Sequence, residues 1–365
     1  MHASGNLIAG AWRYLAALAV LICAATTVVA AGYTLTGRIN GPDGMWDYAE
    51  IDAASHRLYL AQTAQISMLD LTPGGIWSQI GQPGAMWHQV LPLPSRGLML
   101  ATNGAEHALA VYELNTHTLL TNIRTGSGAS EALKGREAAY AVLSDPDALV
   151  LEPQSGLAAV VNGGSGDIVL VDLEHDVVVG TVHVGGKLEF AVVDGRGNLF
   201  VTVETTHAIA VIDVARRAVL RRIRLQGCEE PTGLAYDSAA DLLVSVCGNG
   251  VVKFMSAASG TELASLKVGR GADAVLLDAK RRRIFIPSAA DARLHIFDIH
   301  DPHDVRETQT LMTEPGVRLG ALDALSGNLY LPAARLGPPV APRPWPSAVA
   351  GTFHVLVVTP PFSDL

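Results

Sequence analysis

Seven polar or charged residues recur along the chain and could together form one binding or catalytic site. These residues, which we call the start positions, are Asp47, His88, Asp147, Glu189, Thr232, Asp273 and Arg318. The gaps between them are 41, 59, 42, 43, 41 and 45 residues. A fold that repeats with this period would bring residues that are far apart in the sequence to one place.

The chemistry of such a site would be dominated by carboxylates. Oxygen ligands without a thiolate cluster suit Ca²⁺ or Mg²⁺ better than a soft metal. The candidate metal ligands are Asp47, Asp147, Glu189, Glu204 and Asp273. Carboxylates held close together raise one another's pKa values unless a cation compensates. The alternative is a water-filled funnel in which the acids are simply solvated.

Further side chains are expected near the same mouth. Fifteen residues after a start position come Gln62, Asn103, Asn162 and Glu204, which we place in a second ring just outside the first. Trp46 and Trp87 precede start positions, while Tyr48 and Phe190 follow them. Aromatic rings of this kind can stack on sugars or bases. Packing between neighbouring repeats is the alternative.

The elements that must position these residues are short strands. Each repeat contains about four strand signals of alternating, β-branched residues within about forty residues, the period of a four-stranded propeller blade. We therefore predict an all-β fold, a seven-bladed β-propeller with four-stranded blades. The seventh repeat supplies three strands, so the N-terminal strand from Tyr33 to Ile39 is expected to close the last blade.

Two other features concern the loops. Five residues after each start position an acid opens a turn in six of seven repeats, and we interpret it as structural because Asp accepts backbone N–H groups in turns. Insertions occur at residues 126–142, with a helix-like run at 130–140, and at the proline-rich residues 335–350. Such loops serve as lids, partner sites or plain decoration.

The N-terminus and the cysteines indicate the compartment. Residues 1–31 read as a signal peptide, which leaves residues 32–365 as one domain, periplasmic or secreted, with no membrane span. Cys228 and Cys247 fall at the same end of the fifth repeat, so we predict a disulfide that acts as a structural staple.

Charge and absent motifs exclude several classes of function. Without residues 1–31 the chain has 25 Lys and Arg against 35 Asp and Glu, because Arg13 is lost from the 26 basic residues. Such a surface does not favour nucleic acid, and the basic cluster Lys280–Arg283 falls in a turn. The sequence contains no haem, zinc-protease, nucleophile-elbow or phosphate-loop motif.

Several segments resemble the YVTN-type β-propeller repeat family, and more narrowly its exported YncE-like branch. The likeness is carried by segments such as Trp46–Tyr48, Arg57–Ala61, Val161–Asp167, Glu189–Val192 and Cys228–Ala235, although the family tetrad itself does not occur. The resemblance implies a bacterial exported propeller. Propellers of similar shape bind DNA, hydrolyse lactones or lyse cyclic substrates, but no catalytic set maps onto this chain.

We therefore expect a monomeric, exported, non-catalytic propeller that binds a small ligand or a periplasmic protein through the funnel at the start positions. Its ligand-binding residues would be the seven start positions with Trp46, Trp87, Asn103 and Asn162. The alternative is a divalent-metal-dependent enzyme of lactonase or lyase type, in which His88 moves a proton. DNA binding is the third interpretation, and the acidic charge disfavours it.

Overall fold

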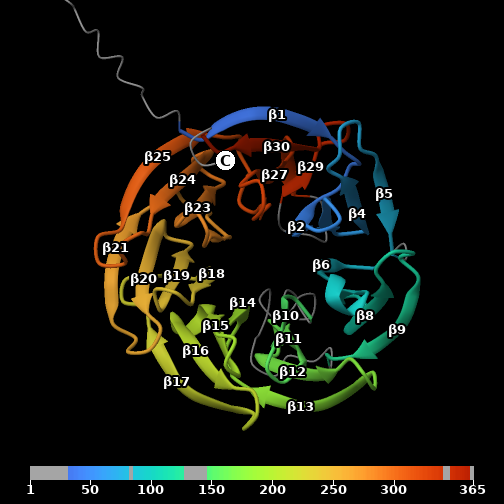
Figure 1. Ribbon diagram of the computed structural model, residues 1–365, viewed down its shortest axis with the longest axis vertical. Coiled ribbons are helices and arrows are strands. Elements are labelled where there is room, and N and C mark those ends of the chain that lie inside the picture. The colour runs from blue at the N-terminus through green and yellow to red at the C-terminus, as the bar shows by residue number, and fades with distance from the viewer. Residues whose placement is uncertain (1–31, 82–84, 127–145, 340–345, 362–365) are drawn as a thin grey trace, which may run out of the picture. The chain divides into compact units, whose positions relative to one another are not determined.

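The computed structural model describes residues 32–81, 85–126, 146–339 and 346–361 of the chain. Within these residues, seven four-stranded antiparallel sheets surround a central axis, and the two helices are single 3₁₀ turns, η1 (Pro94–Arg96) and η2 (Glu204–Thr206). Figure 1 shows the ring of sheets with its innermost strands around the axis. The predicted all-β, seven-bladed propeller is confirmed.

The first six blades follow the chain from the innermost strand outward. Blade 1 contains β2 (Trp46–Asp52), β3 (Arg57–Gln62), β4 (Gln65–Asp70) and β5 (Trp77–Ile80). Blade 2 contains β6 (Trp87–Leu93), β7 (Leu98–Asn103), β8 (Ala108–Glu113) and β9 (Leu119–Arg124). Blade 3 contains β10 (Leu149–Leu151), β11 (Ala158–Asn162), β12 (Asp167–Asp172) and β13 (Val177–His183).

The next three blades repeat this order. Blade 4 contains β14 (Leu188–Val193), β15 (Asn198–Val203), β16 (Ala208–Asp213) and β17 (Ala218–Arg224). Blade 5 contains β18 (Pro231–Asp237), β19 (Leu242–Cys247), β20 (Val251–Ser256) and β21 (Glu262–Lys267). Blade 6 contains β22 (Leu276–Asp278), β23 (Arg283–Ser288), β24 (Arg293–Asp298) and β25 (Arg306–Met312).

Blade 7 is built from both ends of the domain, as predicted. Its strand order is β26 (Ala321–Leu322), β27 (Leu329–Ala333), β30 (His354–Thr359) and β1 (Thr34–Asn40). Figure 1 shows β1 on the outside of β30. Just before β1, Tyr33 is buried against Phe285 of blade 6, with ring centroids 4.9 Å apart. Closure of the ring removes the exposed strand edges that an open propeller would leave.

The hydrophobic core lies between neighbouring blades. The Phe254 and Phe297 rings, for example, pack edge to face with centroids 5.8 Å apart across blades 5 and 6, and both are fully buried. The outermost strands show the alternating exposure expected of a half-buried strand, as in β25, because one face meets solvent. The blades are therefore stabilised by burial against each other.

The acids at the fifth position hold turns, which confirms their predicted structural role. The Asp52 carboxylate accepts the Ala54 N–H at 3.1 Å, and the Asp194 carboxylate accepts the Arg196 N–H at 2.7 Å. The same bond, to a backbone N–H two or three residues further on, is made by Glu152, Asp237, Asp278 and Asp323. These turns fix the end of each innermost strand.

The two insertions lie largely outside the described residues. The first, residues 126–142 with its helix-like run, falls almost wholly in 127–145, which the structure does not describe. In the second, a short hairpin pairs β28 (Leu336–Pro339) with β29 (Pro346–Ala348). The predicted signal peptide, residues 1–31, also lies outside the described part of the chain.

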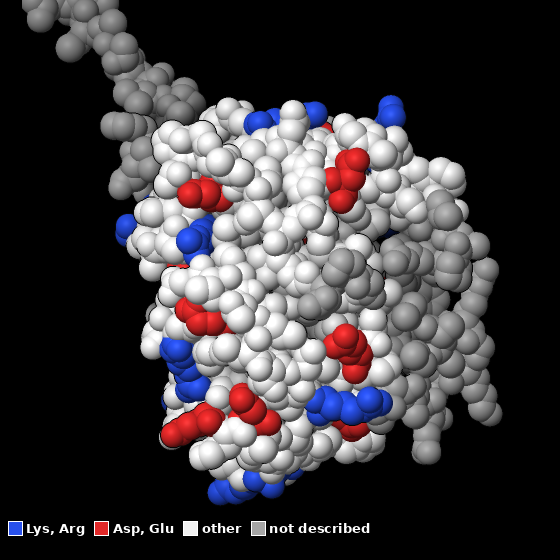
Figure 2. Space-filling model, turned by 90° about the vertical axis from the view of Figure 1, so that its right-hand side faces the viewer, with Lys and Arg blue, Asp and Glu red and all other residues white. Residues whose placement is uncertain are grey.

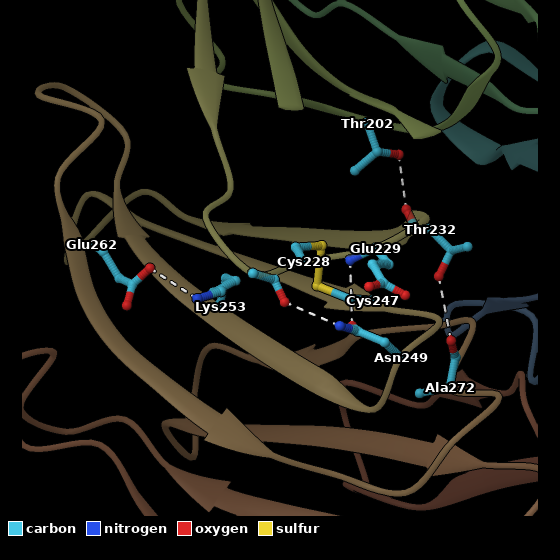
Figure 3. The surroundings of a disulfide bond; sticks show 10 residues. Thr202, Cys228, Glu229, Thr232, Cys247, Asn249, Lys253, Glu262 and Ala272 are labelled. Carbon is cyan, nitrogen blue, oxygen red and sulfur yellow. Dashed lines mark hydrogen bonds and ion pairs between the residues drawn. A yellow bond between two sulfur atoms is a disulfide. The ribbon is translucent and has the colours of Figure 1, made fainter. Parts of the chain in front are cut away.

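A disulfide joins Cys228 and Cys247, as predicted, with a Cα–Cα distance of 5.4 Å. Figure 3 shows it beside the start of β18, on the same side of blade 5 as Thr232. Asn249 reinforces this corner by donating to the Gly227 carbonyl at 3.0 Å and accepting the Glu229 N–H at 3.3 Å. The disulfide thus fastens the segment that leads into an innermost strand.

Candidate functional site

All seven start positions line one cavity at the end of the central channel where the innermost strands begin. This cavity, which we call the funnel pocket, has a volume of about 620 Å³. Lys187 and Glu204 also line it, as do Leu336 and Pro346 of the β28–β29 hairpin. Rotational symmetry thus brings together side chains from all seven repeats, and one insertion reaches the rim.

Recurrent β-bulges explain how the start positions come to face the pocket. The pairing of the innermost strand with its neighbour shifts by one residue between Trp46 and Ala49 in blade 1 and between Trp87 and Val90 in blade 2. Equivalent shifts occur in blades 4 and 5. Because a bulge re-aims side chains at a strand end, the residue at the start position and the residue after it can both line the channel.

His88 lies between two carboxylates from other blades. Its Nδ1 is 2.9 Å from the nearer Asp47 oxygen and 3.7 Å from an Asp147 oxygen. One ligand atom from each of the three residues lies within 4.8 Å of the others. The three side chains come from β2, from β6 and from the segment before β10, so closure of the ring assembles the cluster.

Lys187 is a functional candidate that the sequence reasoning missed. Its ammonium group contacts the carboxylates of both Glu189 and Glu204. Lys187 lies just before β14, and the pairing of that strand shifts between Leu188 and Ala191, so strand alternation does not predict where the lysine points. The signal in the sequence was its position two residues before a start position. The lysine therefore compensates two of the five acids that line the pocket.

Arg318 compensates a third acid. Its Nε donates to the Asp273 carboxylate at 2.9 Å, and its Nη2 donates to the Trp46 carbonyl at 3.2 Å. The Thr232 hydroxyl donates to the Ala272 carbonyl at 3.3 Å (Figure 3). Asp47 and Asp147 are left with His88 as their cationic or neutral partner, so the pocket has more carboxylates than permanent cations.

Burial shifts the pKa values of these acids upward. It raises the pKa of Asp147 to about 7, although His88 acts in the opposite direction. Burial also raises the pKa of Glu189 well above its ordinary value against the effect of Lys187, and it raises the pKa of Asp273 against the effect of Arg318. Burial lowers the pKa of Lys187, but the Glu189 and Glu204 carboxylates outweigh that effect and the net shift is upward.

The aromatic and amide residues are placed differently. Trp46 and Trp87 line the pocket edge but are each only 2% exposed, and their rings pack against Phe353 and Tyr112. Ligand stacking on these two rings stays a prediction. The amides of Gln62, Asn103 and Asn162 bind backbone groups of the adjoining loops and do not line the funnel pocket.

In the basic cluster Lys280–Arg283, the three arginines form ion pairs with acidic residues. Arg281 pairs with Asp278, Arg282 with Asp237, and Arg283 with Asp298. On the side of the molecule in Figure 2, acidic and basic groups are scattered among uncharged residues without a broad basic patch. The three arginines of this cluster are therefore paired within the fold.

Comparison with known proteins supports the fold and does not identify a family or a function. No known family profile and no curated protein sequence matches this chain. Among solved structures it is similar to a chain in a structure titled "Crystal Structure of Mitotic Checkpoint Complex", with a TM-score of 0.68 and 11% identity. The match covers 97% of this chain and 98% of that chain. At this identity the similarity shows the propeller fold alone.

In the part of the chain that the structure describes, no helix has the length and apolar character needed to cross a membrane.

Proposed function

We propose that this protein is an exported binding protein whose funnel pocket binds a small, polar, positively charged ligand. The observation that carries the proposal is the charge of one pocket, where the described lining residues include five carboxylates and two permanent cations, Lys187 and Arg318. An ammonium or guanidinium group that enters beside Asp47 and Asp147 would offset the mutual repulsion of these acids. No catalytic step is part of this proposal.

Export is supported by the disulfide and by the sequence. Disulfides persist in oxidising compartments such as the periplasm or the medium, and Cys228–Cys247 joins two segments of one blade. The signal-like residues 1–31 and the resemblance to exported YncE-like propellers support the same location. Because the β28–β29 hairpin reaches the rim of the pocket, its surface could also contact a periplasmic protein, which a pull-down with the isolated chain would reveal.

The test is calorimetric titration with 1,4-diaminobutane, with 1,4-butanediol as the uncharged compound of similar length. We expect binding of the diamine but not of the diol, and loss of diamine binding in the double variant Asp147→Asn, Glu189→Gln. Asp304→Asn is the matched control, because Asp304 lies on an exposed loop and pairs only with Arg306. Equal binding of diamine and diol, or full binding by the double variant, would contradict the proposal.

A second candidate function, a divalent-metal-dependent enzyme, is favoured by the Asp47–His88–Asp147 cluster. The donors fit a metal, because two carboxylate oxygens and an imidazole nitrogen lie close enough to share one ion. Glu189, Glu204 and Asp273 fit less well, since Lys187 and Arg318 contact them. A nitrogen donor favours Mn²⁺ or Zn²⁺ over the Ca²⁺ or Mg²⁺ expected from the acids alone. A bound ion would polarise a substrate oxygen.

Calorimetry on chelator-treated protein separates the two functions. Under the enzyme interpretation, Mn²⁺ or Zn²⁺ binds with a stoichiometry near one, and His88→Ala abolishes binding while Asp304→Asn does not. If Mn²⁺, Zn²⁺, Ca²⁺ and Mg²⁺ all give no heat of binding and leave the melting temperature unchanged, the second candidate is removed and the first stays in place.

A further inference from the structure

A second ring of equivalent residues lies deeper in the channel than the start positions. The residues three positions after each start position are Glu50, Leu91, Val150, Val192, Ala235, Leu276 and Ala321. All seven line one or both of two adjoining cavities of about 240 and 430 Å³. Six members of this ring, which we call the apolar layer, are hydrocarbon side chains, and Glu50 is the exception.

Glu50 lines both cavities and makes no ion pair with another described residue. The hydrogen-bonding group that acts on its carboxyl group is the Ile51 backbone N–H. The other titratable residues that line them are Tyr48, Asp273 and Tyr236, and none of these can supply a positive charge. Two lining residues contact basic groups: Asp273 pairs with Arg318 at 2.9 Å, and the Tyr236 hydroxyl accepts from the Arg196 guanidinium at 3.4 Å. The carboxyl group thus faces an apolar space without compensation.

Gln89 supplies a second polar group to the same space. It lines both cavities, and its side-chain oxygen accepts the Leu149 N–H at 2.7 Å. Its amide N–H₂ group makes no hydrogen bond with the described residues. One carboxyl group and one amide donor, set in hydrocarbon walls, are the few convergent polar groups typical of a small-molecule site.

Two aromatic rings separate this region from the funnel pocket. Tyr48 of β2 and Phe190 of β14 meet across the channel with ring centroids 5.1 Å apart. Tyr48 lines the funnel pocket and the smaller inner cavity, whereas Phe190 lines the two inner cavities. A ligand in the apolar layer would therefore lie on the other side of this ring pair from the other start positions. Asp273, which Arg318 pairs, lines both the funnel pocket and the smaller inner cavity.

We propose that the apolar layer binds a second ligand, an organic ammonium ion with a short apolar body, whose positive charge lies at Glu50. The hydrocarbon walls favour the apolar body, and an isolated carboxylate in such walls is costly unless it is paired. A cation offers that pairing and a neutral ligand does not. This site is distinct from the proposed function, because it lies in another part of the channel and selects a different type of molecule.

The electrostatics agree with this geometry. Burial raises the pKa of Glu50 to about 7, although a hydrogen bond from the Ile51 backbone acts in the opposite direction. Without a cation, the carboxyl group is therefore partly protonated near neutral pH. An alkylammonium ion keeps its charge well above pH 8, since its pKa resembles that of lysine at about 10.4, so its binding should strengthen as Glu50 ionises.

The experiment compares hexylammonium with 1-hexanol by calorimetry on the purified chain at pH 8.5. We expect hexylammonium to bind at least about tenfold more tightly than hexanol, the scale of one charge-assisted hydrogen bond. The variants are compared in the Asp147→Asn, Glu189→Gln background, because the funnel pocket is itself proposed to bind ammonium groups. There, adding Glu50→Gln should remove this preference, while adding Glu174→Gln, on an exposed turn of blade 3, should keep it. Equal affinity for the amine and the alcohol, or an unchanged preference in Glu50→Gln, would overturn the proposal.

Two further measurements make the outcome independent of variant folding and of the funnel pocket. In the unaltered chain, hexylammonium binding should weaken at least about tenfold from pH 8.5 to pH 5.5, and hexanol binding should not. The variant Asp147→Asn, Glu189→Gln should still bind hexylammonium. Loss of diamine binding in that variant with hexylammonium retained separates the two sites, whereas loss of both ligands would overturn the second site.

Discussion

The charged layer of start positions and the apolar layer lie three residues apart, on or just before the same seven innermost strands, yet the carboxyl groups of the two layers have different partners. In the charged layer, Lys187 and Arg318 contact three of the acids, and His88 lies beside the other two. In the apolar layer, Glu50 has no described cation beside it. The first layer compensates most of its charge with its own residues, while the second depends on a ligand for compensation.

Removal of the strand that closes the ring should have the largest effect and should abolish the difference between the two layers, because both layers depend on closure. Deleting Thr34–Asn40 removes β1, which pairs with β30, and leaves the edge of β30 exposed to solvent. We expect loss of the cooperative melting transition and of both binding activities together. Differential scanning calorimetry with the two titrations checks this, and an unchanged melting temperature would contradict the closure.

Removal of the disulfide tests whether the two ends of β18, one in the charged layer and one in the apolar layer, are stabilised independently. Replacing Cys228 and Cys247 by Ser should lower the free energy of unfolding by about 3 kcal/mol, on the chain-entropy model for a loop of this size. Amide hydrogen exchange should quicken at Thr232 and Gly233 more than at residues 235–237. Uniform quickening along β18 would show that the two ends are not independent.

Lys187→Met sharpens the comparison by making the charged layer resemble the apolar one. Glu189 and Glu204 would lose their shared cation, at a cost of about 2 kcal/mol, which we set below the 3–5 kcal/mol of a fully buried pair because Lys187 is partly exposed. The loss should be larger at pH 8 than at pH 5, because the raised pKa of Glu189 favours its neutral form as the pH falls. Adding Glu204→Gln should recover part of the stability, and thermal melts at both pH values provide the measurement.

Glu50→Leu should have the smallest effect and the opposite sign. A carboxyl group whose folded pKa is raised from 4.5 to about 7 destabilises the fold progressively as pH rises through that range. At pH 8.5, the Leu variant should therefore be more stable by about 1–2 kcal/mol, the shift being discounted because Glu50 is partly exposed. At pH 4.5 the difference should vanish. Glu174→Leu serves as the control and should show no such pH dependence.

The sequence was sufficient to predict the fold and much of the charged layer. Spacing identified the seven repeats, the strand that closes blade 7, the turn acids and the disulfide, because each depends on local pattern and on rotational symmetry. The gathering of the start positions around one cavity follows from the same symmetry. The start positions and the turn acids can be read from one chain because they recur from repeat to repeat, whereas the disulfide and the closing strand follow from their places relative to that repeat.

The rest depends on details that vary from blade to blade. Lys187 was missed because it occurs two residues before a start position in only one repeat. Glu50 was missed because the bulges decide which residues of the innermost strands face the channel, and bulges have no clear sequence signature here. Asn103 and Asn162 were expected at the mouth, but their side chains bind the backbone of adjoining loops.

A crystal structure of the chain grown with 1,4-diaminobutane tests the central claim most directly. We predict diamine density in the funnel pocket, with one ammonium nitrogen about 3 Å from carboxylate oxygens of Asp47 or Asp147. Density confined to the outer surface, or a funnel pocket that holds only water at a saturating diamine concentration, would contradict it.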